Sequence, residues 1–352
     1  MASNRTVDVL IVGQGLAGTV AAFHLIQRGK SVLVVDNHHY NCASKVAAGL
    51  YNPFVFKWIT KSWMADELLP ELENTYRGME SMLDAKFFHP TGIERIIASS
   101  NEQKQWERKS QRPDVASHID SNFQPLPVPD KGFGRVQIST AGWLDLRTML
   151  SAFRDYLSDN DWLVEEPFMH DELHVGSPNV YRDISCSHVL FCEGAGVMNN
   201  PFFRDLDWKH TKGEVLDVSM PAPELSRCLN YGQFIVPLGG QQHRTGTTYN
   251  WDVLDFEPSE EAREKILRNH EAYFGARPEV KEHRAGVRPT SADRRPFAGK
   301  HPSHPSIAIL NATGSKGVML APWSSRQLVE HLLDGRPLHP EIDVARKIGG
   351  DA

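Results

Sequence analysis

A strand pattern, a glycine-rich turn, a helix pattern and a second strand pattern follow one another near the N-terminus, and this segment constrains the fold more than any other. Residues 7–12 form a β-branched apolar run, residues 16–27 have the composition of a helix, and residues 32–35 form a second apolar run. A βαβ unit of about 30 residues with a G-x-G-x-x-G turn before its helix is typical of dinucleotide-binding domains. The sequence therefore predicts a Rossmann-like domain that binds a nucleotide.

Each residue of this fingerprint has a physical task. Gly13 permits the tight turn, Gly15 lets the backbone approach a pyrophosphate, and Gly18 lets the helix pack closely on the strand. Leu16 and Ala17 begin the helix, whose first N–H groups and positive dipole end favour a phosphate. We therefore expect all five residues at the cofactor.

An acidic residue ends the second apolar run. Asp36 lies roughly 20 residues beyond the glycines, the distance at which an acid binds ribose hydroxyls, and Asn37 follows it directly. An aspartate at this place is also common in nicotinamide-dependent enzymes. An NAD-dependent dehydrogenase is therefore one interpretation of the fingerprint.

The order of patterns along the rest of the chain predicts two interleaved domains. Helices and strands alternate at the N-terminus, in the middle and at the C-terminus, whereas runs of short strands lie between these regions. We therefore predict an α/β fold in which residues 1–80, 146–210 and 286–352 form a discontinuous nucleotide-binding domain. Residues 81–145 and 211–285 are expected to form a mainly antiparallel β-sheet domain for the substrate.

Charge and composition exclude several classes of protein. The net charge of -6 gives no overall attraction for nucleic acid. The N-terminus lacks a basic stretch followed by an apolar one, so no signal peptide is expected, and no apolar run reaches the ~20 residues of a transmembrane helix. The four cysteines form no C-x-x-C pair, which indicates reduced thiols in a cytoplasm, and the sixteen histidines form no H-E-x-x-H motif. We expect no metal site.

Further segments add a family resemblance. After the fingerprint come ASKVAAGLYNP (residues 43–53), HVLFCEGAG (188–196), KGEVLDV, FIVP, AGVRPTSADRRPFAG (285–299) and GSKGVMLAP (314–322). This ordered set resembles the D-amino acid oxidase and glycine oxidase family of FAD-dependent oxidoreductases, which includes sarcosine oxidases and the oxidase half of a bifunctional tRNA-modifying enzyme. The resemblance implies a GR2-type FAD-binding domain. The sarcosine oxidases of this family attach their flavin covalently to a cysteine in the C-terminal part of the chain. No cysteine follows Cys228 here, so the resemblance implies that FAD is bound non-covalently.

The resemblance also implies which residues contact FAD. The fingerprint glycines would face the pyrophosphate and Asp36 the adenosine ribose. The further residues expected at the cofactor are Ala43, Ser44, Ala48, Gly49, Leu50, Val164, Gly194, Gly196, Gly314, Ser315, Lys316, Gly317 and Val318. The last helix would point its N-terminus at the flavin N1–C2=O edge, where Lys316 would add a positive charge. A solvent-facing loop lysine is the alternative for Lys316.

Four arginines lie in residues 283–299, and the resemblance separates one from the rest. Arg288 occupies the G-x-R-P position whose guanidinium holds the substrate carboxylate in amino acid oxidases, because its fork matches two carboxylate oxygens. Arg284, Arg294 and Arg295 are expected to be surface charges or members of local ion pairs.

One position departs from the family pattern. Glycine-oxidase-like members have a tyrosine before the I-V-P triplet, and its hydroxyl helps to hold the substrate. Here that position is Phe234. Tyr231 or Tyr249 is a possible replacement for this hydroxyl, which puts a glycine or simple D-amino acid substrate in doubt.

The resulting hypothesis is an oxidoreductase that breaks a C–H bond next to nitrogen in a small amino acid or related amine. Hydride would pass to flavin N5, and water would hydrolyse the imine. The electron acceptor that re-oxidises the flavin, O2 or a quinone, is left open. Two alternatives within flavoproteins remain: a carboxymethylamine oxidase of the tRNA-modifying type, favoured by the GSKG loop, and a flavin-binding protein without catalysis.

Overall fold

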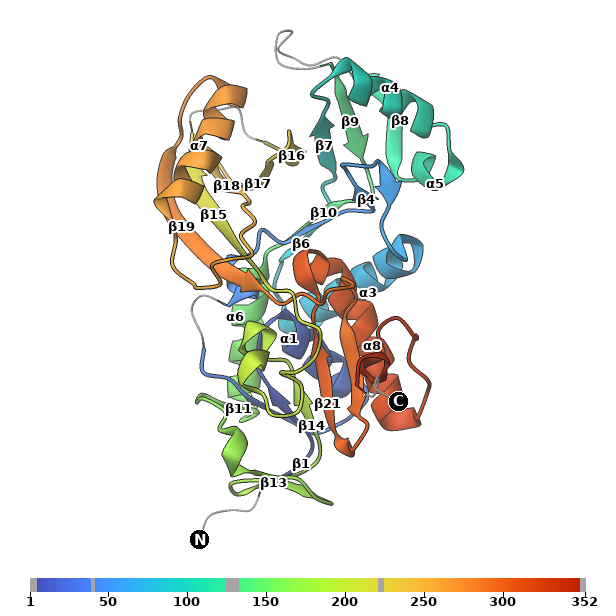
Figure 1. The fold of residues 1–352 in the computed structure, drawn as a ribbon, viewed down its shortest axis with the longest axis vertical. Coiled ribbons are helices and arrows are strands. Elements are labelled where there is room, and N and C mark those ends of the chain that lie inside the picture. The colour runs from blue at the N-terminus through green and yellow to red at the C-terminus, as the bar shows by residue number, and fades with distance from the viewer. Residues whose placement is uncertain (1–4, 39–41, 125–132, 221–224, 349–352) are drawn as a thin grey trace.

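The computed structural model describes residues 5–38, 42–124, 133–220 and 225–348. Two large sheets organise the chain (Figure 1). The sheet that carries both the N-terminal strand and the C-terminal strands lies in the lower half of the view, with helices packed on it, and the other sheet spans the upper half.

The first sheet is the nucleotide-binding one. Its eight strands are β1 (Arg5–Val12), β2 (Val32–Val35), β11 (Leu163–Val164), β12 (Leu173–His174), β13 (Asn179–Tyr181), β14 (Ile184–Phe191), β20 (Phe297–His301) and β21 (His304–Asn311). Strands β11, β2, β1, β14 and β21 are parallel neighbours in that order. The central strands are buried on both faces, which explains their uninterrupted apolar sequences.

Helices cover the first sheet and connect its strands. The helices of the chain are α1 (Leu16–Gln27), α2 (Ala43–Val46), α3 (Ala65–Leu83), α4 (Ser100–Lys109), α5 (Pro113–Ala116), α6 (Leu146–Asp159), α7 (Glu260–Phe274) and α8 (Gly317–Asp334). Helices α1, α3, α6 and α8 share one hydrophobic core with the first sheet. Short 3-10 turns are η1 (His170–Glu172), η2 (Gly194–Asn199), η3 (Gly314–Lys316) and η4 (Val344–Arg346).

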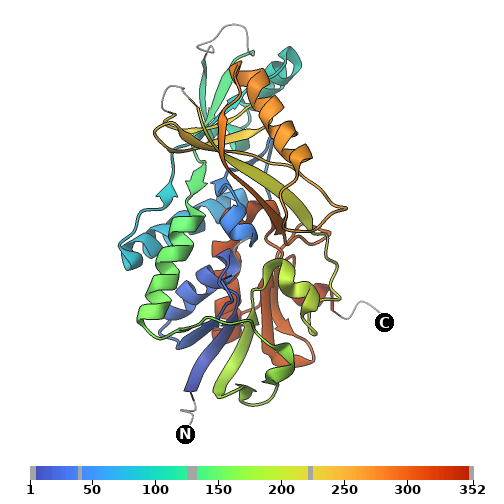
Figure 2. The same ribbon diagram turned by 90° about the vertical axis from the view of Figure 1, so that its left-hand side faces the viewer.

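The second sheet is almost entirely antiparallel. Its strands, in spatial order, are β19 (Glu279–Arg288), β15 (Thr211–Ser219), β18 (Gln242–Gly246), β17 (Phe234–Gly239), β16 (Cys228–Asn230), β7 (Ile93–Ile96), β9 (Arg135–Ile138) and β8 (Ile119–Gln124). Only the β16–β7 pair is parallel among these described strands. Helix α7 packs against β15, on the opposite side of this sheet from the nucleotide-binding half (Figure 2).

Small elements join the two halves. Strands β3 (Leu50–Tyr51), β10 (Gly142–Leu144) and β6 (Phe88–His89) form a three-stranded sheet, and β4 (Phe54–Val55) pairs with β5 (Thr60–Lys61). The predicted fold class is confirmed: a parallel nucleotide-binding sheet is interleaved with a mainly antiparallel one. Within the described ranges, no helix has both the length and the apolar composition to cross a bilayer.

Candidate cofactor and substrate site

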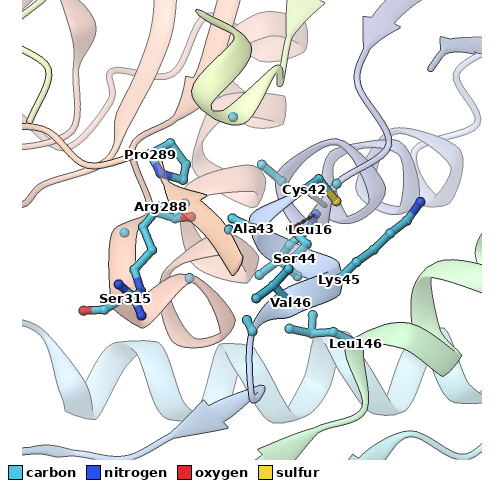
Figure 3. Close-up of a pocket in the computed structure, with 18 of the residues that line it drawn as sticks. Leu16, Cys42, Ala43, Ser44, Lys45, Val46, Leu146, Arg288, Pro289 and Ser315 are labelled. Carbon is cyan, nitrogen blue, oxygen red and sulfur yellow. Dashed lines mark hydrogen bonds between the residues drawn. The ribbon is translucent and has the colours of Figure 1, made fainter. Parts of the chain in front are cut away.

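A cavity of about 830 Å³ is lined by residues from both halves of the molecule. Its lining includes the glycine turn after β1, residues 42–52, the turn before α8, and parts of β15, β16, β17 and β19. Figure 3 shows Arg288 and Ser315 on one side of this cavity and the α2 residues on the other. The carboxyl ends of β1 and β2 therefore meet the second sheet at a single site.

Glycine is required by geometry in the turn after β1. Gly13 has a φ of 99°, and a Cβ atom there would lie 2.6 Å from the carbonyl oxygen of Cys192. A Cβ at Gly18 would lie 1.9 Å from the carbonyl oxygen of Gly13, so helix and turn are in direct backbone contact. At the start of α1, the Leu16 N–H donates to Ser44 Oγ at 3.0 Å. The turn thus offers backbone rather than side chains to the cavity.

Asp36 is held in place by three donors. Its Oδ2 accepts from the Gln14 N–H at 2.8 Å, and its Oδ1 accepts from the His38 N–H at 2.8 Å and from Arg154 Nη1 at 2.9 Å. Arg154 also donates to Glu165 Oε2 at 2.8 Å. The carboxylate lines the cavity in a fixed orientation, as a ribose ligand requires.

Arg154 was missed by the sequence analysis, although a signal exists. In α6 the apolar residues Leu146, Met149, Leu150 and Phe153 recur at helical spacing, Arg154 directly follows Phe153, and the structure buries Arg154 with them. A charged residue on an apolar helix face needs a partner. Its partner proves to be Asp36.

The segment after α2 approaches the rest of the chain closely. Gly49 has a φ of 75°, and a Cβ there would lie 1.9 Å from the carbonyl oxygen of Leu144. Two arginines of the second sheet bind the end of α2: Arg284 Nη1 donates to the Lys45 carbonyl at 2.9 Å, and Arg244 Nη1 donates to the Ala47 carbonyl at 3.3 Å. The small residues predicted here therefore lie where backbone meets backbone at the cavity wall.

Lys316 is not a solvent-facing loop lysine, so that alternative is wrong. Its ammonium donates to Ser62 Oγ at 2.6 Å and to the carbonyl oxygens of Phe54 at 3.2 Å and Asn52 at 3.3 Å. Burial lowers its pKa to about 8. The lysine ties the turn before α8 to the β4–β5 region while it lines the cavity.

Arg288 ends β19 and lines the cavity with a guanidinium that has only neutral partners. Its Nη2 donates to Thr247 Oγ1 at 2.7 Å, both terminal nitrogens lie 3.4 Å from the Thr248 carbonyl, and its Cζ lies 4.7 Å from the centre of the Tyr249 ring. Among the residues that the structure describes, no acidic side chain lies within ion-pair distance. Burial lowers its pKa and the neighbouring Tyr249 raises it, but a guanidinium stays charged.

The guanidinium of Arg288 lies directly over Gly213 of β15. A Cβ atom at Gly213 would lie 1.9 Å from Nη2 and 2.2 Å from Cζ of Arg288. The missing side chain at position 213 thus makes the space for the guanidinium. The sequence alone gave no indication of this role, because the contact joins residues on two different strands.

The aromatic residues near this arginine have separate positions. Phe234 and Tyr249 line the cavity. Tyr231 stacks on Tyr273 with ring centres 4.3 Å apart, and its hydroxyl accepts from Gln233 Nε2 at 3.1 Å. Of the two tyrosines considered for the missing hydroxyl, Tyr249 is therefore the one beside Arg288.

The other three arginines have different surroundings. Arg284 is 3% exposed and donates to Asp217 Oδ2 at 2.7 Å, so of the two expectations the ion pair is confirmed for it and the surface charge is wrong. Arg295 donates to Glu341 Oε2 at 2.6 Å near the surface, and Arg294 is exposed.

Most of the predicted cofactor residues lie together. The cavity is lined by Gly13, Gly15, Leu16, Ala17, Asp36, Asn37, Ala43, Ser44, Ala48, Gly49, Leu50, Gly194, Gly196, Gly314, Ser315, Lys316, Gly317 and Val318. Gly18 lies behind the turn, and Val164 lies outside the cavity lining, where its carbonyl accepts from the Asp36 N–H at 3.0 Å.

Comparison with known proteins identifies the family that this fold and site define. The model of the DAO family, described as FAD dependent oxidoreductase, matches residues 8–331. The chain belongs to this family and is an FAD-dependent oxidoreductase. The family assigns FAD, and not a nicotinamide, to the fingerprint.

Relatives and solved structures agree with this assignment. Glycine oxidase of Pseudomonas aeruginosa is 24% identical over 96% of this chain and 97% of its own length. The tRNA 5-methylaminomethyl-2-thiouridine biosynthesis bifunctional protein MnmC of Marinobacter nauticus is 22% identical over 97% of this chain and 58% of its own length. The crystal structure of glycine oxidase from Bacillus cereus superposes with a TM-score of 0.79 at 21% identity, covering 95% of this chain and 96% of that chain.

The residues present fit FAD. Gly13 and Gly18 allow the turn and α1 to pack against neighbouring backbone, so the turn presents backbone to the cavity, α1 begins at the cavity, and the Asp36 carboxylate is fixed for a ribose. The lining then continues along residues 42–52 to the turn before α8. An extended dinucleotide needs a continuous path of this kind, with its pyrophosphate at a helix N-terminus.

Proposed function

We propose that this protein oxidises the C–N bond of a primary or secondary amine that carries a carboxylate group. One observation carries the proposal: Arg288 lines the cavity with a guanidinium that no acidic residue of the described chain neutralises. An unpaired charge in such a place is costly unless an anion completes the site. A carboxylate matches the planar fork of the guanidinium.

The chain's own residues would bind and orient this substrate. FAD, when bound, supplies the acceptor for the hydride that leaves the carbon next to nitrogen, and water hydrolyses the resulting imine. Arg288 would fix the carboxylate, and Gly213 would keep space for the guanidinium. Orientation of this kind supplies much of the rate without a dedicated base.

The cofactor residues are proposed to act as the family resemblance implies, with FAD held non-covalently. The fingerprint turn would bind the pyrophosphate, Asp36 the ribose, and the turn before α8 the flavin edge. The predicted ranges 1–80, 146–210 and 286–352 are proposed as the cofactor domain, and 81–145 and 211–285 as the substrate domain.

Anaerobic reduction of the FAD-loaded protein tests the proposal. The panel contains amino acids and N-substituted glycines. Each compound is compared with the amine that has the same structure without the carboxylate group. We expect at least one carboxylated member to bleach the flavin absorbance, and its decarboxylated partner to react about 100-fold more slowly or not at all, because only the former binds Arg288. Equal rates for both partners would refute the anchor, and bleaching by no member would favour the non-catalytic alternative.

A further inference from the structure

The face of the second sheet that lines the cavity changes character from one edge to the other. On the β19 side it presents the guanidinium of Arg288 and the hydroxyl of Thr247. Further along the same face, β17 and β7 contribute Phe234 and Ile93. The wall beyond the proposed anchor is therefore apolar.

The spacing of the strands shows how far this apolar wall lies from the anchor. The Arg288 guanidinium lies over Gly213 of β15, and β18 separates β15 from β17. Neighbouring strands are about 4.8 Å apart, so the β17 backbone at Phe234 lies roughly 10 Å from β15 and the β7 backbone at Ile93 roughly 19 Å from it. A glycine molecule held through its carboxylate is too short to extend along this wall to Ile93.

The opposite wall of this part of the cavity is also apolar. Phe54 and Phe56 line it from the β4 region, and Phe56 and Phe234 pack against the hydrophobic core that contains Ile93. The polar residue Asn230 also lines the cavity here, and its Oδ1 accepts a hydrogen bond from Arg95 Nη1.

We propose that the substrate of this site carries a bulky apolar group, branched aliphatic or aromatic, on the amine-bearing carbon or on the nitrogen. This proposal rests on the proposed function, because it places the carboxylate at Arg288. Glycine would fill only the polar end of the cavity. Phe234 then has a purpose of its own: a phenylalanine continues the apolar wall, whereas a tyrosine hydroxyl at the same place would interrupt it.

Binding of carboxylates that cannot be oxidised tests the proposal without turnover. Acetate, 4-methylpentanoate and 3-phenylpropanoate are titrated into the FAD-loaded protein by calorimetry, with the flavin spectrum as a second readout. The larger acids should bind about 10- to 200-fold more tightly than acetate, as expected for apolar groups that enter an apolar pocket. Equal affinities for all three acids would overturn the apolar subsite.

Two variants and a control locate the effect. Phe56→Ala removes an apolar ring from the wall, so it should weaken 3-phenylpropanoate by about tenfold and leave acetate unchanged. Phe234→Tyr places a hydroxyl in the apolar wall and should weaken the larger acids by roughly fivefold or more. Tyr231→Phe removes a hydroxyl from the same hairpin outside the cavity and should change neither affinity. If neither Phe56→Ala nor Phe234→Tyr alters the ratio of the affinities, the assignment of the wall is wrong.

The same titration separates this inference from the proposed function. Arg288→Met should abolish the binding of all three acids if the anchor is correct. Loss of binding in Arg288→Met together with equal affinities in the wild type would retain the anchor and reject the apolar subsite. Acid binding that is indifferent to Arg288→Met would reject the anchor itself.

Discussion

Two arginines of one strand, Arg284 and Arg288, lie four residues apart on β19, and side chains at this spacing point to the same face of a sheet. Arg284 donates to Asp217 Oδ2 at 2.7 Å and to the Lys45 carbonyl at 2.9 Å. Arg288 donates to the Thr247 hydroxyl at 2.7 Å and has no acidic partner among the described residues. The charge of Arg284 is therefore neutralised by a carboxylate of the protein, whereas the charge of Arg288 on the same strand is not.

The partner, rather than burial, distinguishes a structural arginine from a binding one. Burial lowers the pKa of both side chains, for Arg284 to about 10. Arg284 is compensated within the second sheet by its ion pair with Asp217, and its hydrogen bond to the Lys45 carbonyl connects this sheet to α2. Arg288 is compensated only by dipoles and a ring, so an anion would stabilise it. We therefore propose that the first arginine serves folding and the second serves ligand binding.

Replacing each arginine by methionine should produce opposite phenotypes, and this is the largest expected effect. Arg288→Met should lower kcat/KM for the carboxylated substrate by about 30- to 4000-fold, because removing one partner of a buried charge pair costs roughly 2–5 kcal/mol. Its Tm and FAD content should not fall, because no ion pair is lost. Arg284→Met should instead lower the free energy of unfolding by about 3 kcal/mol. Steady-state kinetics and thermal unfolding of both variants provide the measurements.

The comparison fails if the two variants behave alike. A large stability loss in Arg288→Met would show that its partners are structural. A selective loss of substrate affinity in Arg284→Met, with normal Tm, would place that arginine in the site.

The second prediction concerns the shared carboxylate of the structural group. Asp217 accepts from Arg244 Nε at 2.7 Å as well as from Arg284, and these two arginines bind the backbone carbonyls at the end of α2. Asp217→Asn should cost about 3–5 kcal/mol of stability, because two neighbouring guanidinium groups lose their counter-charge. FAD should also bind more weakly, because α2 begins the segment that lines the cofactor cavity.

Urea unfolding and the dissociation constant of FAD measure these two effects. Arg295→Met provides a control for the loss of an ion pair near the surface, for which a stability change within about 1 kcal/mol is expected. An Asp217→Asn variant as stable as this control would show that the buried group contributes no stability.

Much of the fold was predictable because local patterns determine it. The fingerprint and the apolar runs of β1 and β2 are readable within a few residues of chain, and the observed bounds of α1 agree with the predicted helix over residues 16–27. The parallel order of β2, β1 and β14 also follows from the βαβ unit and a long apolar strand.

The site was only partly predictable because its partners come from distant segments. Arg288 was identified from its motif, but nothing near it in sequence indicates that Gly213 makes space for its guanidinium. Arg284 lies in the same stretch of sequence as Arg288, but its partner Asp217 is 67 residues away along the chain. The two side chains meet only because β15 pairs with β19. Likewise, the oxygen partners of Lys316 lie more than 250 residues earlier.

The third prediction tests the space beneath Arg288 with a single methyl group. In Gly213→Ala the new Cβ would lie 1.9 Å from Nη2, so the guanidinium must move. We expect a loss of roughly tenfold in affinity for carboxylates, with FAD binding unchanged, because a small displacement disrupts a two-point contact. Gly232→Ala is the control, because Gly232 lies in a hairpin of the same sheet and a Cβ there meets no atom within 4 Å. Its φ of 97° is strained for alanine, so this variant should lose some stability but no carboxylate affinity. Carboxylate affinity should fall in the first variant alone.

The last prediction is a pH dependence of stability from Lys316. Burial lowers its pKa from 10.5 to about 8, so between these two values the unfolded chain holds a proton that the folded chain has released. Stability then rises with pH across this interval, by at most about 1.4 kcal/mol per pH unit. Lys316→Met should remove this rise, whatever the offset caused by the loss of the hydrogen bonds to Ser62, Phe54 and Asn52. The measurement is the Tm of the FAD-loaded wild type and variant between pH 8 and 10.5, and parallel curves for the two proteins would show that Lys316 stays charged throughout.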